Sequence, residues 1–468
     1  MGCGSLSKVN ENVANKNIQN ELQVQDIKGI IEQNLNEIKI RNPQVLIEEI
    51  EKQQTLKKQQ QVDQDNNDKI SNVSDHHSIK LASNKTSPKT TQETIISKQD
   101  LMLTQAISKY SHVFYTEILQ KEVFKLSSKL KKHISIGQFN RNVNQAKRIQ
   151  NEIRILVKNL PIYSTNSIFV RCNELDTNHF QCIIMGSKDT PYAYGAFTYD
   201  LHCDYNFPSC PPKMRLITTG GGSVRFNPNL YKDGFICLSL LGTWNGQKNE
   251  KWNESSSNIL QILISIQSLV MNDQVYYNEP SVEKQNPENE MRNRAYQNII
   301  KISNIRHAMI DQLKNPDPEF RDIIKMHFYL NKNEILNQCD KWIIDAKQSD
   351  ASNTKYDAFV KSHNCFLAQR YKNDYSLYAK DLIDTVYELK QEIQRIDIST
   401  LPLYQEFLQN MNNQPEEKCP SIEDKQEQQQ ILAIPSKTQN VNQTNLHEHV
   451  IDKDPHLNDL VLANELSV

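Results

Sequence analysis

One cysteine stands in a segment whose composition is typical of a reactive loop. Cys237 follows an Asn-Pro-Asn turn at 227–229 and an Asp-Gly turn at 233–234, within a long irregular stretch. Chemistry is often carried by loops on a rigid scaffold, and a thiolate is a strong nucleophile. No histidine adjoins Cys237 as a general base, which favours attack on an activated acyl group over peptide hydrolysis. A buried structural cysteine is the alternative, because free cysteine also behaves as a small apolar residue.

The overall composition excludes several classes of function. The 468 residues carry 54 basic and 56 acidic side chains, a net charge of −2, so no nucleic-acid partner is expected. The nine cysteines form no CxxC pair, which favours reduced thiols in the cytoplasm over disulfides or a zinc site. Histidine-containing clusters at 75–77 and 447–449 lie in polar segments, so neither a metal nor a cofactor is predicted.

The N-terminus has features of a lipid-modified sequence. Gly2 follows the initiator Met and is a candidate for myristoylation, and Cys3 beside it is a candidate for palmitoylation. Leu6 stands where that motif usually has Ser or Thr. Two acyl chains would hold the protein peripherally on a membrane, whereas one would anchor it only marginally. An unmodified, disordered N-terminus is the alternative.

The segment around Cys237 resembles the core of the ubiquitin-conjugating enzyme (E2) family. That family has an Asn eight residues before the catalytic cysteine, in a frame ending Gly-x-Ile-Cys-Leu. Here Asn229 precedes Cys237 by the same spacing, and Gly-Phe-Ile-Cys-Leu spans 234–238. Upstream, the Thr-Pro-Tyr motif within 186–197 and Phe-Pro-Ser-Cys-Pro-Pro-Lys at 207–213 are similar to two further family motifs.

The match is closer to a subgroup of large E2s, the BIR-repeat-containing E2 and related E2/E3 hybrids. The segments 218–231, 237–244 and 277–280 look like that subgroup, and the resemblance covers roughly residues 144–347. Nothing in the remaining length looks like a BIR zinc module, so the chain resembles the E2 portion alone. The resemblance implies three kinds of partner: an E1 activating enzyme, ubiquitin or a ubiquitin-like protein, and protein substrates.

The resemblance also implies roles for three residues. Cys237 would carry the modifier as a thioester and pass it to substrate lysines. Asn229 would donate to the oxyanion of the transfer step, or support the loop through hydrogen bonds. Asp273 is the nearest acidic candidate to orient the attacking lysine, although a solvated residue at a helix end is the more frequent reading.

Departures from the family concern partners and leave alternatives open. Ser209 stands near the residue that small E2s present to RING ligases, and Trp252 begins Trp-Asn-Glu-Ser instead of Trp-Ser-Pro-Ala. Residues 242–251 lengthen the loop after the cysteine and favour E2/E3 hybrid character. One alternative is a catalytically inactive E2-like ubiquitin-binding scaffold at a membrane. Another is a cysteine hydrolase, whose base would be one of four histidines: His179, His202, His307 and His327.

These residues must be positioned by an α+β domain. Apolar periodicity and turn residues predict a UBC fold: an N-terminal helix, a four-stranded antiparallel meander, an active-site loop and C-terminal helices, flanked by disordered polar termini. Strands are expected at 167–172, 180–185, 196–203 and 213–218. Helices are expected at 26–40, 101–132, 144–160, 259–271, 296–313, 319–330, 332–347 and 375–395. The predicted divisions are a disordered tether (1–100), a docking helix (101–140), the UBC core with its helical extension (141–347), accessory helices (353–398) and a disordered tail (414–468).

Overall fold

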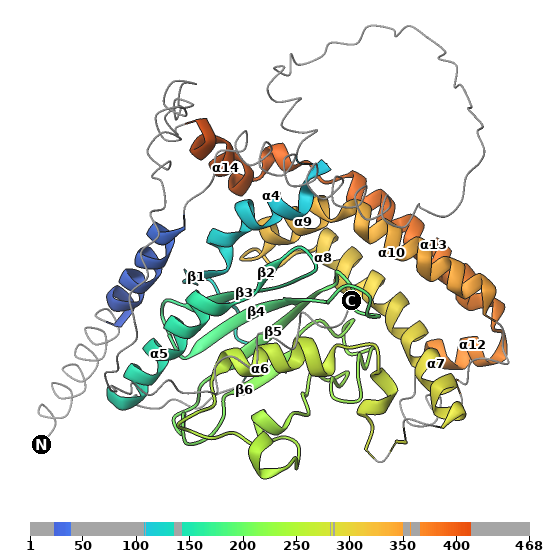
Figure 1. Ribbon diagram of the computed structural model, residues 1–468, viewed down its shortest axis with the longest axis horizontal. Helices are drawn as coiled ribbons and strands as arrows, with labels where there is room; N and C mark the ends of the chain where they lie inside the picture. The colour runs from blue at the N-terminus through green and yellow to red at the C-terminus, as the bar shows by residue number, and fades with distance from the viewer. Residues whose placement is uncertain are drawn as a thin grey trace, which may run out of the picture. The chain divides into compact units, whose positions relative to one another are not determined.

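The computed structural model describes residues 23–38, 107, 109–134, 143–280, 282–283, 286–349, 356 and 366–412 (Figure 1). Gly2 and Cys3, the histidine clusters at 75–77 and 447–449, and the predicted tail all lie outside the described residues. So does most of the predicted tether. Within the described part of the chain, no helix has the length and apolar character needed to cross a membrane.

An antiparallel meander forms the centre of the molecule. Its strands are β3 (Asn166–Asn173), β4 (His179–Met185), β5 (Ala196–His202) and β6 (Lys213–Leu216), which pair in chain order. Every residue of β4 and β5 is buried, so these strands pack on both faces. The predicted α+β arrangement with a four-stranded meander is confirmed.

Two helices pack together on this sheet and lie near the active-site loop. They are α5 (Val143–Asn159) and α6 (Ile259–Ser265), and η4 (Ile266–Val270) continues α6 as a π-helical turn. The Asn258 side chain accepts from the Gln261 N–H at 2.9 Å and begins α6. Gln267 Nε2 donates to the Met185 carbonyl at 3.0 Å, which binds η4 to the end of β4.

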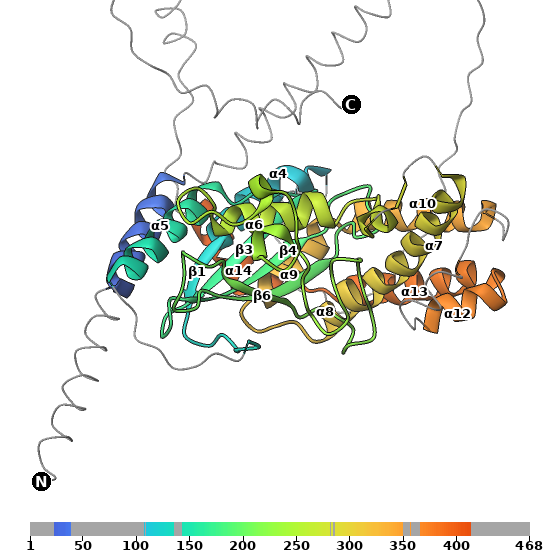
Figure 2. The same cartoon turned by 90° about the horizontal axis from the view of Figure 1, so that it is seen from below.

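Most of the C-terminal helices gather at the other end of the domain in both views, whereas the last of them lies beside the helix at 111–119 (Figures 1 and 2). The Asn304 side chain, fully buried at the start of η6 (Asn304–Ile310), donates to the carbonyls of Pro191 and Ala193 and so ties η6 to the turn before β5. The helical elements are α7 (Pro287–Ser303), η6 (Asn304–Ile310), α8 (Asp311–Lys314), α9 (Arg321–Leu330), α10 (Lys332–Gln348), α12 (Phe366–Asn373), α13 (Ser376–Gln394) and α14 (Pro402–Asn412).

The segment predicted as one helix over 101–132 has a different structure. It contains α4 (Ser111–Leu119), the short η1 (Gln120–Glu122) and a strand, β1 (Phe124–Ser127), which pairs in parallel with β3. The Arg171 guanidinium binds the Glu122 carboxylate at 2.7 Å and the Glu122 carbonyl at 2.8 Å. These contacts hold the chain in η1, after which β1 covers the edge of β3 that would otherwise lack a partner.

A second helix occupies residues 23–37, close to the helix expected at 26–40 and inside the segment predicted as a tether. It lies beside α5 in both views (Figures 1 and 2). Ile27 is fully buried in its contact surface, and Gln150 of α5 donates to the Asp26 carboxylate at 3.0 Å. A salt bridge joins Lys28 to Glu174 at 2.5 Å. This part of the N-terminal segment is therefore packed on the domain.

Candidate active site

Cys237 lies in the loop that runs from β6 to α6, and its backbone is tied to the Asn-Pro-Asn turn. Its N–H donates to the Asn229 carbonyl at 2.9 Å, so the two residues with predicted roles are adjacent. The residue as a whole is 7% exposed, and its thiol donates to the Thr243 carbonyl at 3.4 Å. The cysteine is thus packed within the loop, with its sulfur oriented by the chain that follows it.

The environment of the thiol favours its neutral form. Burial raises the pKa of Cys237 above its ordinary value, and the positive charge of Arg225 offsets part of that effect. A thiolate of high pKa is also a slow leaving group. A thioester formed on Cys237 would therefore be lost slowly to incidental nucleophiles, which suits a residue that carries an acyl group between two reactions.

Asn227 anchors the active-site loop through its side chain. Its amide donates to the Val270 carbonyl at 2.8 Å and to the Tyr192 hydroxyl at 3.0 Å. Its Oδ1 accepts from the Asn229 N–H at 3.0 Å and from Asn278 at 3.1 Å. Because Asn227 is fully buried, these four bonds satisfy it. They also bring two motifs that are distant in sequence to the same loop, namely Thr-Pro-Tyr at 190–192 and Tyr-Asn-Glu-Pro at 277–280.

Asn229 is left available by this arrangement. Its carbonyl supports the loop by accepting from Cys237, but no hydrogen bond of its side-chain amide is found within the described residues. The residue is half-buried beside the cysteine. The loop-pinning expected of the Asn229 side chain is made by Asn227, a residue without a predicted role. Small members of the family that this segment resembles carry His-Pro-Asn here, so the Asn at the His position was the available signal.

Arg225 is a second residue without a role assigned from the sequence. Its guanidinium donates to the Pro228 carbonyl at 2.5 Å and lies 4.1 Å from the centre of the Tyr231 ring. Glu279 lies 3.8 Å away and partly balances its charge. A cation in the otherwise apolar Val-Arg-Phe run could have been noticed, but its partners are visible only in the fold.

Thr243 organises the chain just after the cysteine. Its hydroxyl donates to the Ile236 carbonyl at 2.6 Å and accepts from the Leu238 N–H at 2.9 Å. Its own carbonyl accepts the hydrogen bond from the Cys237 thiol. The rest of the 242–251 insertion is largely exposed and contains one short 3-10 turn, η3 (Lys248–Glu250).

Asp273 is the third residue with a predicted role. It is exposed in the turn after η4, where Gln274 donates to its carboxylate at 3.1 Å. Its carbonyl accepts from the side chains of Asn293 and Gln297. Neither Cys237 nor Asn229 is among its hydrogen-bond partners in the described part of the chain.

The surface around Ser209 and Trp252 is polar, and its groups form hydrogen bonds with one another. The Trp252 indole N–H donates to the Pro208 carbonyl at 2.6 Å, and the Ser209 hydroxyl donates to Glu254 at 2.8 Å. Arg148 of α5 donates to the Glu254 carbonyl at 2.5 Å. The apolar loop residue that small E2s present is thus replaced by an exposed serine.

The four histidines considered as bases all have other partners. His179 binds Asp200 at 2.6 Å, and His307 binds Asp311 at 2.7 Å. His202 contacts Asp176 at 3.4 Å, and His327 donates to the Tyr194 carbonyl at 3.0 Å. Among the described residues no histidine forms a hydrogen bond with Cys237, and this disfavours the hydrolase alternative.

Comparison with known proteins identifies the domain. The family model described as ubiquitin-conjugating enzyme matches residues 148–304. The human protein "Dual E2 ubiquitin-conjugating enzyme/E3 ubiquitin-protein ligase BIRC6" is 44% identical over 206 residues, which are 44% of this chain and 4% of that protein. "Probable ubiquitin-conjugating enzyme protein 17" of Caenorhabditis elegans is 40% identical over 202 residues, 43% of this chain and 28% of that protein. "Putative ubiquitin-conjugating enzyme E2 38" of Arabidopsis thaliana is 34% identical over 201 residues, 42% and 59% of the two chains.

The chain spans less than two thirds of each relative's length, and each match covers less than half of this chain. Within those limits the comparisons, the motifs and the meander agree. The predicted resemblance to the E2 family, including the large BIR-repeat-containing subgroup, is confirmed. Residues 148–304 are therefore a ubiquitin-conjugating (UBC) domain, and this part of the chain is related to BIRC6 and other E2 enzymes.

Proposed function

We propose that this protein accepts ubiquitin, or a ubiquitin-like protein, from an E1 enzyme as a thioester on Cys237. In that step the sulfur attacks the carbonyl of the E1 thioester, the new S–C bond forms, and the E1 thiol leaves with the proton. The observation that carries the proposal is the loop itself. Cys237 is bonded through its backbone to Asn229, while a neighbouring asparagine makes the structural contacts.

In the second step a substrate lysine, as the free amine, attacks the thioester of Cys237. The N–C bond forms, the S–C bond breaks, and the proton lost by the amine ends on the departing sulfur of Cys237, which restores the thiol. The transient oxyanion needs a donor, and our candidate is the Asn229 side-chain amide, for which no hydrogen bond is found within the described residues. Asp273 lies in the turn between Val270 and Asn278, and both of these residues are hydrogen-bonded to Asn227. Asp273 would orient the lysine only if the loaded modifier or the substrate brought the amine to its carboxylate.

E1-dependent charging tests the first step directly. The purified chain, E1, ATP and ubiquitin are analysed on non-reducing gels beside Cys237→Ala and Cys237→Ser. We expect a reducible adduct in the wild type, none in the alanine variant, and a reductant-resistant ester in the serine variant. If neither ubiquitin nor other modifiers formed an adduct, the inactive ubiquitin-binding scaffold would become the better explanation.

The finer proposal is E2/E3 hybrid character. It is supported by the polar, self-bonded surface at Ser209 and Trp252, and by the dual E2/E3 name of the related BIRC6. Deletion of residues 245–250 tests the contribution of the insertion, because it spares Thr243 and Trp252, which hold the two ends. We expect charging to persist and substrate choice without a RING ligase to be lost. Unchanged substrate choice would contradict the hybrid proposal for this loop.

We also propose that the protein is cytoplasmic and is held peripherally on membranes by acylation of Gly2 and Cys3. Two chains would give stable anchoring where one does not. Cell fractionation of the wild type against Gly2→Ala and Cys3→Ser tests this. Either substitution should move the protein to the soluble fraction, and an unchanged distribution would contradict the proposal.

A further inference from the structure

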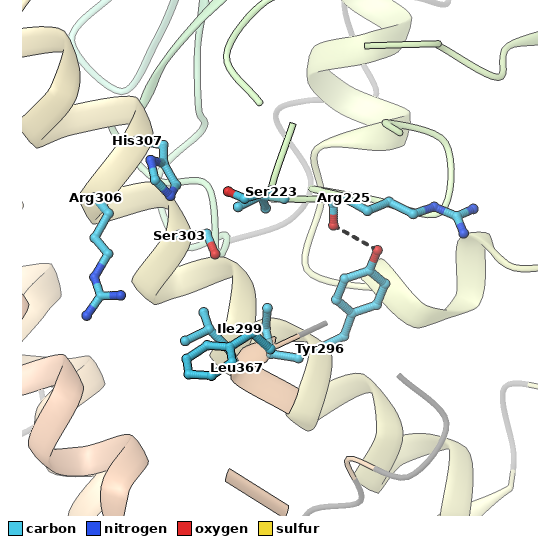
Figure 3. Close-up of a pocket in the computed structure, with 10 residues that line it drawn as sticks. Ser223, Arg225, Tyr296, Ile299, Ser303, Arg306, His307 and Leu367 are labelled. Atoms are coloured by element: carbon cyan, nitrogen blue, oxygen red, sulfur yellow. Dashed lines mark hydrogen bonds between the residues drawn. The ribbon is translucent and has the colours of Figure 1, made fainter. Parts of the chain in front are cut away.

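A cavity outside the thioester site lies between the segment 223–225, the helix formed by α7 and η6, and the start of α12 (Figure 3). Its volume is about 180 Å³. A cavity of about 150 Å³ can hold a benzene molecule, whereas pockets for larger small molecules start at about 300 Å³. The space therefore suits a single apolar side chain. Five residues give it apolar walls: Val224, Tyr296, Ile299, Phe366 and Leu367.

One buried polar group in the cavity lacks a partner. Ser303 is 1% exposed, and its hydroxyl forms no hydrogen bond within the described residues. Figure 3 shows this hydroxyl pointing toward the space between Ile299 and Tyr296. Burying a hydroxyl without a partner is unfavourable. An occupant that offers a backbone carbonyl or N–H would satisfy it, so a peptide is a better match than a hydrocarbon.

The charges at the cavity favour an acidic occupant. Arg225, Arg306 and His307 are among the ten lining residues, and no carboxylate is. The two arginines extend to opposite sides of the cavity (Figure 3). Arg306 forms no salt bridge among the described residues, although the more distant Asp381 senses its charge. Glu279 already lies near Arg225 and Asp311 binds His307, so Arg306 is the group at the rim that would attract carboxylates flanking an apolar side chain.

The cavity shares a chain segment with the active-site loop. The Tyr296 hydroxyl donates to the Arg225 carbonyl at 3.1 Å, and this residue lies four positions before Asn229. Four residues span at most about 15 Å. The Asn229 carbonyl in turn accepts from the Cys237 N–H. A lysine roughly six residues from an anchored side chain could therefore reach the thioester.

We propose that this cavity is a substrate-anchor site, which accepts one apolar side chain from an acidic segment of the protein to be modified. The inference rests on the proposed function, since it names the class of substrate sequence that the E2 recognises. The apolar walls hold the anchor, Ser303 binds its backbone, and Arg306 attracts its acidic neighbours. Substrates with such a segment near a lysine are modified in preference to others.

Peptide binding to the full-length chain tests the site without E1 or ubiquitin. The probes are fluorescein-labelled Gly-Asp-Glu-X-Asp-Glu-Gly peptides with Leu, Ile, Met or Phe at X, measured by fluorescence polarisation. The matched controls have Ser at X, or Asn and Gln in place of Asp and Glu. We expect at least one apolar probe to bind, and each control change to weaken binding about tenfold or more.

Variants locate the binding. Arg306→Glu changes the rim and Ser303→Leu fills the cavity, and each should weaken binding about tenfold. Arg321→Glu, an exposed arginine on α9, is the matched control and should change binding less than twofold. Thermal unfolding shows whether Ser303→Leu folds. If it does not, Ser303→Ala replaces it as the test, and this variant should weaken binding by a smaller factor.

The outcomes separate this inference from the proposed function. No binding by any apolar probe, or equal weakening by Arg306→Glu and Arg321→Glu, would overturn the anchor site. Charging of Cys237 should be unaffected by Arg306→Glu, because loading needs no substrate. Peptide binding in a chain that cannot be charged would support the site and refute the E2 proposal. Charging without peptide binding would support the E2 proposal and refute the anchor site.

Discussion

The Asn227 side-chain amide donates to the Val270 carbonyl at 2.8 Å, so the turn before the cysteine is joined to the end of η4. The same side chain accepts from the Asn229 N–H. Replacing it would leave a cavity and unpaired backbone groups in a buried region. The conformation of the active-site loop therefore depends on a residue that does no chemistry itself.

Asn227→Ala should lower the free energy of unfolding by about 2–3 kcal/mol, from lost hydrogen bonds and the partners left unpaired. Charging of Cys237 should fall as well, because the loop loses its anchor. Urea denaturation and the charging assay measure the two effects. Asn245→Ala, at an exposed position in the insertion, is the control and should change neither. Wild-type stability of Asn227→Ala would refute the anchoring role.

Asn229→Ala should leave stability and charging nearly unchanged but slow the discharge of the thioester. Its amide has no partner within the described residues, so stability should change by less than about 0.5 kcal/mol, and charging by less than about twofold. Discharge of the thioester to lysine should fall by about 10²- to 10³-fold, as for loss of an oxyanion donor. Single-turnover discharge measures this, with Asn229→Asp as a variant of similar size. Normal discharge of both variants would exclude the oxyanion role.

The pH dependence of Cys237 alkylation reports its electrostatic environment. Burial raises the pKa of the thiol and Arg225 opposes part of that effect, so the midpoint in the wild type should lie above that of an unperturbed cysteine. Arg225→Gln removes the charge that stabilises the thiolate, so the midpoint should rise further and alkylation at pH 8 should slow. Mass spectrometry of the Cys237 peptide after iodoacetamide treatment measures the rate. Lys232→Gln is the control, and a lower midpoint in Arg225→Gln would contradict the prediction.

The parts of the site that the sequence predicted are those encoded locally. The cysteine, the asparagine eight residues before it, and the strands that position them follow from motif spacing and alternation. The division of labour between Asn227 and Asn229 does not, because it depends on contacts with Val270 and Tyr192, far away in the chain. The role of Thr243 was not predicted for a related reason. A threonine in a polar loop gains its hydrogen-bond partners only when the loop folds back on the chain before it.

Non-local pairing also explains the errors at the N-terminal end. The helical apolar spacing of the segment 101–132 runs from Leu103 to Leu119, and β1 lies beyond it, where parallel pairing with β3 determines the structure. The helix at 23–37 docks on α5, a segment more than 100 residues away, with Gln23 reaching the Ala146 carbonyl across 123 positions. A sequence pattern shows that such a helix is amphipathic, but not which surface completes it.

Docking of the 23–37 helix can be tested at its centre. Ile27→Asp places an unpaired carboxylate at a fully buried position, so the helix should detach from α5. Hydrogen exchange should then increase over 23–37 and on the facing side of α5, and the remainder of the domain should keep its protection. Glu32→Gln, at an exposed position of the same helix, should change nothing. Unaltered exchange in Ile27→Asp would show that the contact is not maintained in solution.

His327 predicts how stability depends on pH. Burial lowers its pKa to about 4, although the hydrogen bond to the Tyr194 carbonyl opposes this. The ring is neutral, so its Nδ1 accepts from the Tyr115 hydroxyl at 2.9 Å. An unfolded histidine, with a pKa of about 6.5, binds its proton first. The contribution of His327 is therefore complete above pH 6.5 and is lost as the pH falls toward 4, by about 3 kcal/mol.

Urea unfolding at several values between pH 7 and pH 4 tests this sign and size. His327→Gln keeps one acceptor and one donor but cannot titrate in this range. Other groups titrate in both proteins, so the difference between the two pH profiles isolates the histidine. The wild type should lose about 3 kcal/mol more than the variant across this interval. Parallel profiles would mean that His327 is protonated as readily in the folded protein as in the unfolded chain.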